Sequence, residues 1–206
     1  GCILKIMKTT TFRREIKRDV ARKTKPADRP KFPRERIFIT GGAGFIGSFL
    51  VKMFLEGGDE VLVYDSFKNY VSPFADNRYH RYLDERRKMI GPAIEKVKYV
   101  EGDIRDPLFL RAALQNFNPH KIVHMAALPI ADRSNVYPQE AVSVNYNGTI
   151  NMLDVSKDLP ELRKFVNISS SMVYGDFTYA PCDEAHGCHP KDVYGATKLG
   201  AENMVS

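Results

Sequence analysis

Tryptophan, a disulfide framework and long apolar runs are all missing from this sequence. It has no tryptophan and only three cysteines among 206 residues. Such a sparse and odd set of cysteines is unlike that of a small secreted domain, which indicates a reducing, cytoplasmic environment. The most apolar stretch, residues 122–131, contains a histidine and a proline and is far shorter than the ~20 apolar residues that cross a bilayer. We therefore expect no membrane span.

Cysteine and histidine, the common zinc ligands, are few, with three cysteines and five histidines in the sequence. One short stretch is rich in cysteine and histidine, and it contains Cys182, His186, Cys188 and His189. Its spacing makes Cys188 and His189 neighbours, which cannot easily both face one tetrahedral ion. We interpret this stretch as an ordinary loop and predict no metal, with a zinc site as the alternative.

Basic charge is concentrated at the N-terminus. Residues 1–36 contain 13 of the 31 Lys/Arg residues and 4 of the 25 Asp/Glu residues, so the rest of the chain is slightly acidic. Residues 1–35 also contain prolines and show no periodicity, which predicts a basic, disordered extension ahead of a folded domain over residues 36–206. An arm that binds nucleic acid or anionic lipid is the alternative, but we expect neither partner.

Short apolar strands alternate with helical patterns from residue 36 onward. The expected strands are 36–40, 60–64, 97–100, 121–124 and 164–168, and the expected helices are 45–56, 79–90, 107–117, 138–157 and 192–206. This alternation is typical of right-handed βαβ units and predicts an α/β fold with a doubly wound, Rossmann-type parallel sheet. Because the chain ends within the last expected helix, we expect the sheet to be incomplete at the C-terminus.

A glycine-rich loop, Gly41-Gly-Ala-Gly44-Phe45-Ile46-Gly47, joins the first strand to the first helix. The glycines allow a tight turn and a close approach of the backbone to a pyrophosphate, which the free N–H groups of the helix can bind. Asp65 follows Gly47 by 18 residues, where an acid binds the adenosine ribose and repels a 2′-phosphate, and no arginine follows it immediately. We therefore predict NAD in preference to NADP, with a turn cap as the alternative role of Asp65.

Tyr194 and Lys198 are four residues apart and would share one face of a helix. A free tyrosine has a pKa of about 10, and a nearby ammonium group lowers it, so that the phenolate can accept a hydroxyl proton. Ser170 lies in a run of three serines after the last expected strand, at the edge of the sheet where such folds bind ligands. These residues predict a proton-transfer triad, and a solvated helix and a serine turn are the alternatives.

Together these motifs resemble the extended short-chain dehydrogenase/reductase family, in particular its NAD-dependent nucleotide-sugar epimerase/dehydratase branch, over about residues 36–206. The resemblance implies catalytic roles for Ser170, Tyr194 and Lys198, of which Tyr194 and Lys198 also contact the cofactor. It implies that NAD is bound by the glycine loop, including Phe45 and Ile46, and by Asp65. Further cofactor contacts implied by the family motifs G-D-I, H-x-A-A and N-x-x-G-T are Asp103, Ile104, Ala126, Ala127 and Asn145.

Among the branches of this family, the sequence is most similar to the UDP-sugar 4-epimerases. Ser171 and Met172 stand where the family's 4,6-dehydratases have an Asp-Glu pair, and the long segment after Asp65 resembles that of uronic-acid epimerases. The resemblance implies a nucleotide-sugar substrate, a UDP-sugar or UDP-uronic acid, whose C4 is oxidised to a transient ketone and reduced again. It also implies a homodimer when full length.

Two further readings stay open. One is a dehydratase, decarboxylase or reductase of the same family; the other is a non-catalytic dinucleotide-binding module, against which the triad argues. Family members continue beyond the Tyr194 helix with a substrate-holding domain. The resemblance therefore implies that this chain is an N-terminal fragment and is inactive alone.

Overall fold

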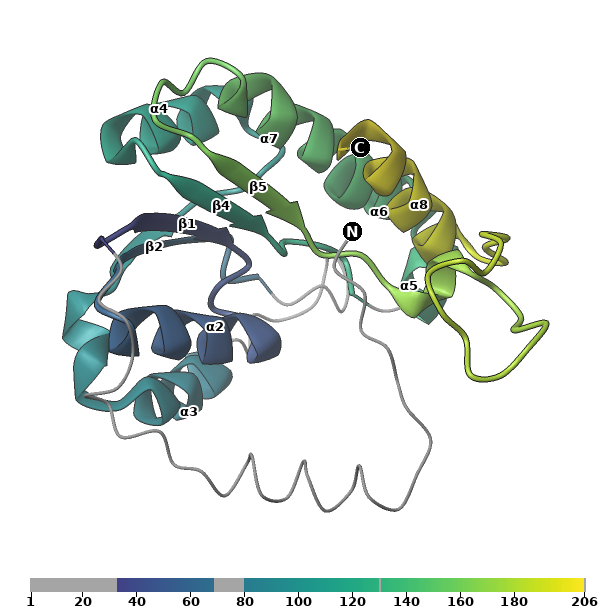
Figure 1. The fold of residues 1–206 in the computed structure, drawn as a ribbon, viewed down its shortest axis with the longest axis horizontal. Coiled ribbons are helices and arrows are strands. Elements are labelled where there is room, and N and C mark those ends of the chain that lie inside the picture. Colours follow the sequence, from purple (N-terminus) through teal and green to yellow (C-terminus); the bar gives the residue numbers. More distant parts are fainter. Residues whose placement is uncertain (1–32, 69–79, 130, 206) are drawn as a thin grey trace. The chain divides into compact units, whose positions relative to one another are not determined.

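Five parallel strands form one sheet in the order β3-β2-β1-β4-β5. Figure 1 labels β1, β2, β4 and β5 of this sheet. The strands are β1 (Arg36–Thr40), β2 (Glu60–Asp65), β3 (Lys98–Glu101), β4 (Lys121–His124) and β5 (Lys164–Asn167). The chain runs outward from β1 to β3 and then crosses back to β4 on the other side of β1. This reversal creates a crevice at the carboxyl ends of β1 and β4, where open α/β sheets bind ligands. The predicted doubly wound Rossmann-type sheet is confirmed.

The computed structural model describes residues 33–68, 80–129 and 131–205, and Arg34–Ser206 form one contact unit. The predicted extension over residues 1–35 therefore lies almost entirely outside the described residues. Glu35, however, belongs to the folded unit. Its N–H donates to Asp59 Oδ1 at 3.0 Å, and its carboxylate lies 2.8 Å from His120 Nδ1. The folded unit thus begins at Arg34, slightly before the expected start.

Helices cover both faces of the sheet (Figure 1). One face carries α2 (Phe45–Glu56) and α3 (His80–Ile90), and the other carries α4 (Pro107–Phe117) and α7 (Gly148–Ser156). The last helix is α8 (Val193–Val205). Across the described ranges, none of the helices combines the length and the apolar surface that crossing a membrane would require.

Local sequence signals explain where α4 begins and ends. Asp106 is its N-cap, and the carboxylate accepts hydrogen bonds from the N–H groups of Leu108 and Phe109 at 3.1 and 3.0 Å. Pro107 occupies the first turn, where its missing N–H costs nothing. Asn118 ends the helix in the left-handed conformation, with φ of 48°. These signals explain why the predicted bounds of 107–117 are correct.

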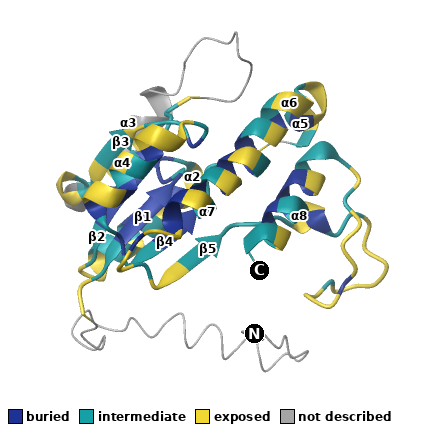
Figure 2. Ribbon diagram, turned by 90° about the horizontal axis from the view of Figure 1, so that it is seen from above, coloured by how far each residue is buried: buried dark blue, intermediate teal, exposed yellow. Residues whose placement is uncertain are grey.

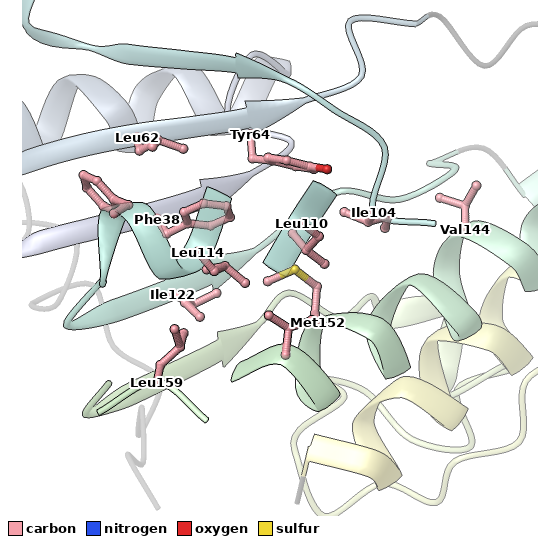
Figure 3. Close-up of a cluster of buried hydrophobic side chains, with 12 residues drawn as sticks. Phe38, Leu62, Tyr64, Ile104, Leu110, Leu114, Ile122, Val144, Met152 and Leu159 are labelled. Atoms are coloured by element: carbon pink, nitrogen blue, oxygen red, sulfur yellow. The ribbon is translucent and has the colours of Figure 1, made fainter. Parts of the chain in front are cut away.

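Alternate residues of the central strands face opposite layers of the core. Phe38, Leu62 and Tyr64 pack toward α4 and α7 together with Leu110 and Met152 (Figure 3). Their neighbours in the same strands pack instead in the layer of α2; these are Ile37, Ile39, Val61 and Val63. Figure 2 shows the resulting burial of β1 between the two layers. Because β1 is buried on both sides, its carboxyl end is a rigid platform for the loop that follows.

The prediction of one regular helix over residues 138–157 is wrong. The structure has α6 (Pro138–Ala141), a π-helical segment η3 (Val142–Asn147) and then α7. Several shorter elements were missed, namely α5 (Ala131–Val136) and the 3₁₀ turns η2 (Gly91–Lys96) and η4 (Ser171–Val173). The bounds of β2, β3, β5, α3 and α8 differ from the predicted ones only at their ends.

Candidate functional site

A cavity of about 450 Å³ opens at the carboxyl ends of the strands. It brings together most of the predicted site residues: Gly41, Gly44, Phe45, Ile46, Gly47, Asp65, Ile104, Ala126, Ala127, Tyr194 and Lys198. The predicted residues that do not line it are Asp103, Asn145 and Ser170. Segments far apart in the chain thus meet at the crevice that the strand order creates.

The glycine loop wraps tightly around the end of β1. Gly41 has φ of +68°, and a Cβ at this position would lie only 2.8 Å from Ala126 N. A Cβ at Gly47 would lie 2.5 Å from Gly41 O, so α2 can press against the loop only because Gly47 has no side chain. Both glycines are therefore required by the packing of the loop.

The first turn of α2 faces the cavity through Phe45, Ile46 and Gly47. Gly44 is the N-cap of this helix, and among the described residues no side chain caps it. Free N–H groups and the helix dipole at such an end favour an anion. The arrangement fits a pyrophosphate, which would bring its own acceptors to these donors.

Asp65 lies at the end of β2 and is held by two backbone N–H groups. Its Oδ2 accepts from Ala43 N at 3.1 Å and its Oδ1 from Phe67 N at 2.9 Å. Burial raises the pKa of Asp65 above its usual range, and the two N–H groups and the nearby Arg86 guanidinium oppose this rise. Two oxygens with four lone-pair positions leave acceptor capacity for ribose hydroxyls.

Tyr194 and Lys198 both reach the cavity from α8. Lys198 is only 6% exposed, and its Nζ donates to Ile168 O at 2.5 Å. Burial lowers the pKa of Lys198 to about 8, although the Glu202 carboxylate partly opposes the shift. The pair therefore lies beside the end of β5, with a lysine that can still carry charge near neutral pH.

The structure places Ser169, rather than Ser170, at the cavity wall. The Oγ of Ser169 is buried and has no hydrogen-bond partner among the described residues. Ser170 instead caps η4, where its Oγ accepts from Met172 N at 3.2 Å. Sequence reasoning missed Ser169, because a run of three serines does not indicate which hydroxyl faces the cavity.

Asp103 lies next to the cavity, but its carboxylate is hydrogen-bonded to the guanidinium of Arg105. Arg105 Nη2 and Nε donate to the two carboxylate oxygens at 2.6 and 2.9 Å. Burial would raise the pKa of Asp103, but these hydrogen bonds outweigh burial and the pKa is lowered. Ile104, its other neighbour in the motif, lines the cavity itself.

Asn145 connects two walls of the site from within the π-helical segment. Its Oδ1 accepts from Leu128 N at 2.7 Å, and its Nδ2 donates to Thr197 Oγ1 at 3.2 Å. The side chain is almost fully buried. In this structure Asn145 therefore holds the segment after β4 against α8 without touching the cavity.

A buried chain of hydrogen bonds runs beneath the cavity floor. Thr40 Oγ1 accepts from Met125 N and Ala126 N, both at 3.1 Å, so its own proton goes to His124 Nδ1 at 2.7 Å. The ring must then carry its proton on Nε2 and donate to Thr149 Oγ1 at 3.1 Å. Burial, with a smaller effect of the Lys198 charge, lowers the pKa of His124 to about 3. The ring is therefore a neutral structural link.

The Cys/His stretch folds around His186. Nε2 of His186 accepts from Thr178 N at 2.9 Å, and Nδ1 lies 2.8 Å from Gly187 O, so both nitrogens are engaged. The ring of Tyr179 packs against it at 4.9 Å between centroids. Within the described residues, no three His, Cys, Asp or Glu side chains are grouped as metal ligands.

The family model described as GDP-mannose 4,6 dehydratase matches residues 38–206. The chain belongs to this family of NAD-dependent epimerases and dehydratases. The resemblance predicted from the glycine loop and the Tyr194–Lys198 pair is confirmed at this level.

Several of the curated relatives that this chain matches are named as epimerases. The UDP-glucose 4-epimerase of Mus musculus is 32% identical over 174 residues, which are 83% of this chain and 48% of the relative. The UDP-glucuronate 4-epimerase 6 of Arabidopsis thaliana is 31% identical over 170 residues, or 82% of this chain and 35% of the relative. The chain thus spans about half the length, or less, of the curated relatives it matches.

The same fold is found in a UDP-glucose-4-epimerase from Stenotrophomonas maltophila, solved with bound NAD and formylated UDP-arabinopyranose. It is 27% identical, has a TM-score of 0.70, and is matched over 84% of this chain and 48% of its own. The presence of NAD in that structure agrees with the cofactor predicted from the glycine loop.

Proposed function

We propose that the protein to which this chain belongs is an NAD-dependent nucleotide-sugar 4-epimerase, an isomerase that acts on a UDP-sugar or UDP-uronic acid. The observation that carries the proposal is the meeting of three motifs in one cavity. The glycine loop, Asp65 and the Tyr194–Lys198 pair come from different parts of the sequence and line the same space. The epimerase relatives support the choice among the reactions of the family.

The cofactor-binding half of the cavity uses fixed donors and one acceptor. The first turn of α2 binds the pyrophosphate through its N–H groups. Asp65 accepts hydrogen bonds from the adenosine ribose and repels a 2′-phosphate. Gly41 and Gly44 leave room for the backbone to approach the cofactor closely. NAD, when bound, supplies a hydride acceptor that can return the same hydride.

The catalytic half of the cavity accepts the proton of the sugar 4-hydroxyl. Tyr194 takes this proton, and the Lys198 ammonium stabilises the phenolate that accepts it. Burial of Lys198 strengthens this effect, because charges interact more strongly where water is excluded. Ser170 remains the predicted hydroxyl that shares the proton. Ser169 is a second candidate, since its unpartnered Oγ lies at the wall.

An assay of the whole protein with UDP-glucose and UDP-glucuronate tests this proposal. We expect the 4-epimer to form without accumulation of NADH and without release of carbon dioxide. Release of NADH would instead identify a net oxidoreductase, and release of carbon dioxide a decarboxylase. Loss of water from the sugar would identify a dehydratase, the reaction after which the family model is named.

Other parts of the hypothesis stay predictions. They are the homodimer, the cytoplasmic location, the absence of a nucleic-acid partner, the role of residues 1–35, and the inactivity of the 206-residue chain by itself. A panel of UDP-sugars with purified chain and NAD checks the last of these; robust epimer formation would contradict it.

A further inference from the structure

Arg86 reaches the glycine loop from α3, an element that sequence reasoning did not connect with the site. Its Nη1 donates to Ala43 O at 2.5 Å. The N–H of the same residue, Ala43, donates to Asp65 Oδ2 at 3.1 Å. The two peptide units that flank Ala43 are therefore each held by a charged side chain. The Asp65 carboxylate accepts from the N–H group, and the Arg86 guanidinium donates to the carbonyl oxygen. Charge-assisted hydrogen bonds of this kind are about twice as strong as neutral ones.

Arg86 also forms part of the cavity wall on the side of Asp65. The lining there includes Asp65, Ser66, Lys68, Arg86 and Gly102. This end of the cavity carries one carboxylate and two cations. The guanidinium is close enough to Asp65 to oppose the rise of its pKa that burial causes. The part of the wall that would face the adenosine half of a dinucleotide thus carries both positively and negatively charged side chains.

The chemistry of a guanidinium suits this place. Its planar fork can donate several hydrogen bonds in fixed directions, and its face stacks on aromatic rings. A lysine at this position would keep the charge but lose both the fork and the flat face. Adenosine offers an aromatic ring and ribose and phosphate oxygens, which are the partners that such a group recognises.

We propose that Arg86 is a cofactor-binding residue that fixes Ala43 and Asp65 and contacts the adenosine half of NAD. The proposal rests on the assignment of this cavity to NAD. It makes α3 a functional part of the site, because an element far from the glycine loop in sequence then contributes to cofactor affinity.

Isothermal titration of the 206-residue chain with NAD and with ADP-ribose tests this role, and it needs no tryptophan signal, which the chain lacks. We expect Arg86→Ala to weaken both ligands about tenfold, the effect of losing a hydrogen bond to a charged group. ADP-ribose is informative because it lacks only the nicotinamide ring, so an equal loss for both ligands shows that Arg86 acts on the ADP-ribose part that the two ligands share. A loss for NAD alone would overturn that assignment.

Lys88→Ala is the matched control. It removes one positive charge from the same helix, but Lys88 is exposed and does not line the cavity. We expect it to change NAD affinity less than about twofold, since exposed charges contribute little. Equal affinities of Arg86→Ala and Lys88→Ala would overturn the proposal.

Two further variants keep the test decisive if Arg86→Ala folds poorly by circular dichroism. Arg86→Lys and Arg86→Gln each retain a donor for Ala43 O but lose the planar cation, so both should bind NAD and ADP-ribose several-fold more weakly. Wild-type affinity in both would overturn the proposal. Absence of NAD binding by the unaltered chain is a distinguishable result, which would overturn the assignment of the cavity itself.

Discussion

Replacing Lys198 by methionine should stabilise the cofactor-free chain at neutral pH, although it removes a residue proposed to act in catalysis. Lys198 is 6% exposed, and burial lowers its pKa from 10.5 to about 8. That difference corresponds to about 3 kcal/mol that folding loses by burying the ammonium group. Methionine has a similar length and no charge, but it leaves Ile168 O without its donor, which costs about 1–2 kcal/mol. The expected net gain at pH 7 is about 1–2 kcal/mol.

The sign of the pH dependence follows from the lowered pKa. Well below pH 8 Lys198 is charged in both the folded and the unfolded chain, so the full cost of burying the ammonium group lowers the stability of the folded chain. Between pH 8 and 10.5 the folded state loses its proton first, so the wild type gains stability relative to the variant as pH rises. By pH 10 the advantage of the variant should have fallen by about 2 kcal/mol.

Urea unfolding at pH 7 and pH 10, followed by circular dichroism, measures both quantities. Lys164→Met is the control, because Lys164 is exposed on β5 and should matter little at either pH. A Lys198→Met variant that is less stable than the wild type at pH 7, or whose stability difference does not change with pH, would refute the burial argument.

Three other predictions concern the cofactor, the proton acceptor and the N-terminal segment. NAD should bind more tightly than NADP, because the Asp65 carboxylate repels a 2′-phosphate; titration with both decides this, and equal or tighter NADP binding would remove Asp65 from that role. In the whole protein, Tyr194→Phe should keep NAD affinity but lower turnover about 10²–10⁴-fold, since only the proton acceptor is lost; a rate within a few-fold of wild type would contradict it. Deleting residues 1–33, which leaves the paired Glu35 in place, should shift the melting temperature little; a clear fall would show that the segment packs on the folded unit.

The sequence predicted those parts of the fold whose signals are local. The bounds of α2 and α4 could be predicted because glycines precede and follow α2, and Asp106, Pro107 and Asn118 delimit α4. The π-helical segment η3 could not, because its apolar pattern is compatible with a regular helix. Its conformation accompanies tertiary contacts such as the hydrogen bonds of Asn145 to Leu128 and Thr197.

In the candidate site, too, the residues that belong to local motifs could be predicted, and those positioned by tertiary contacts could not. The glycine loop and the Tyr194–Lys198 pair are compact motifs, so their presence in one cavity could be predicted from their order and spacing. Arg86 could not be found in this way, because its bond to Ala43 spans 43 residues and follows no motif. The choice between Ser169 and Ser170 likewise depends on the turn after β5, about which the serine run carries no information.

The transfer of hydride at C4 is the most direct test of the proposed function. The whole protein would be incubated with NAD and UDP-glucose in deuterated water, and the product examined by nuclear magnetic resonance. A 4-epimerase that oxidises and reduces the same carbon through NAD should yield the epimer with ordinary hydrogen at C4, and Tyr194→Phe should yield almost none. Deuterium at C4 would show exchange with solvent instead, and no epimer at all from UDP-glucose or UDP-glucuronate would contradict the assignment.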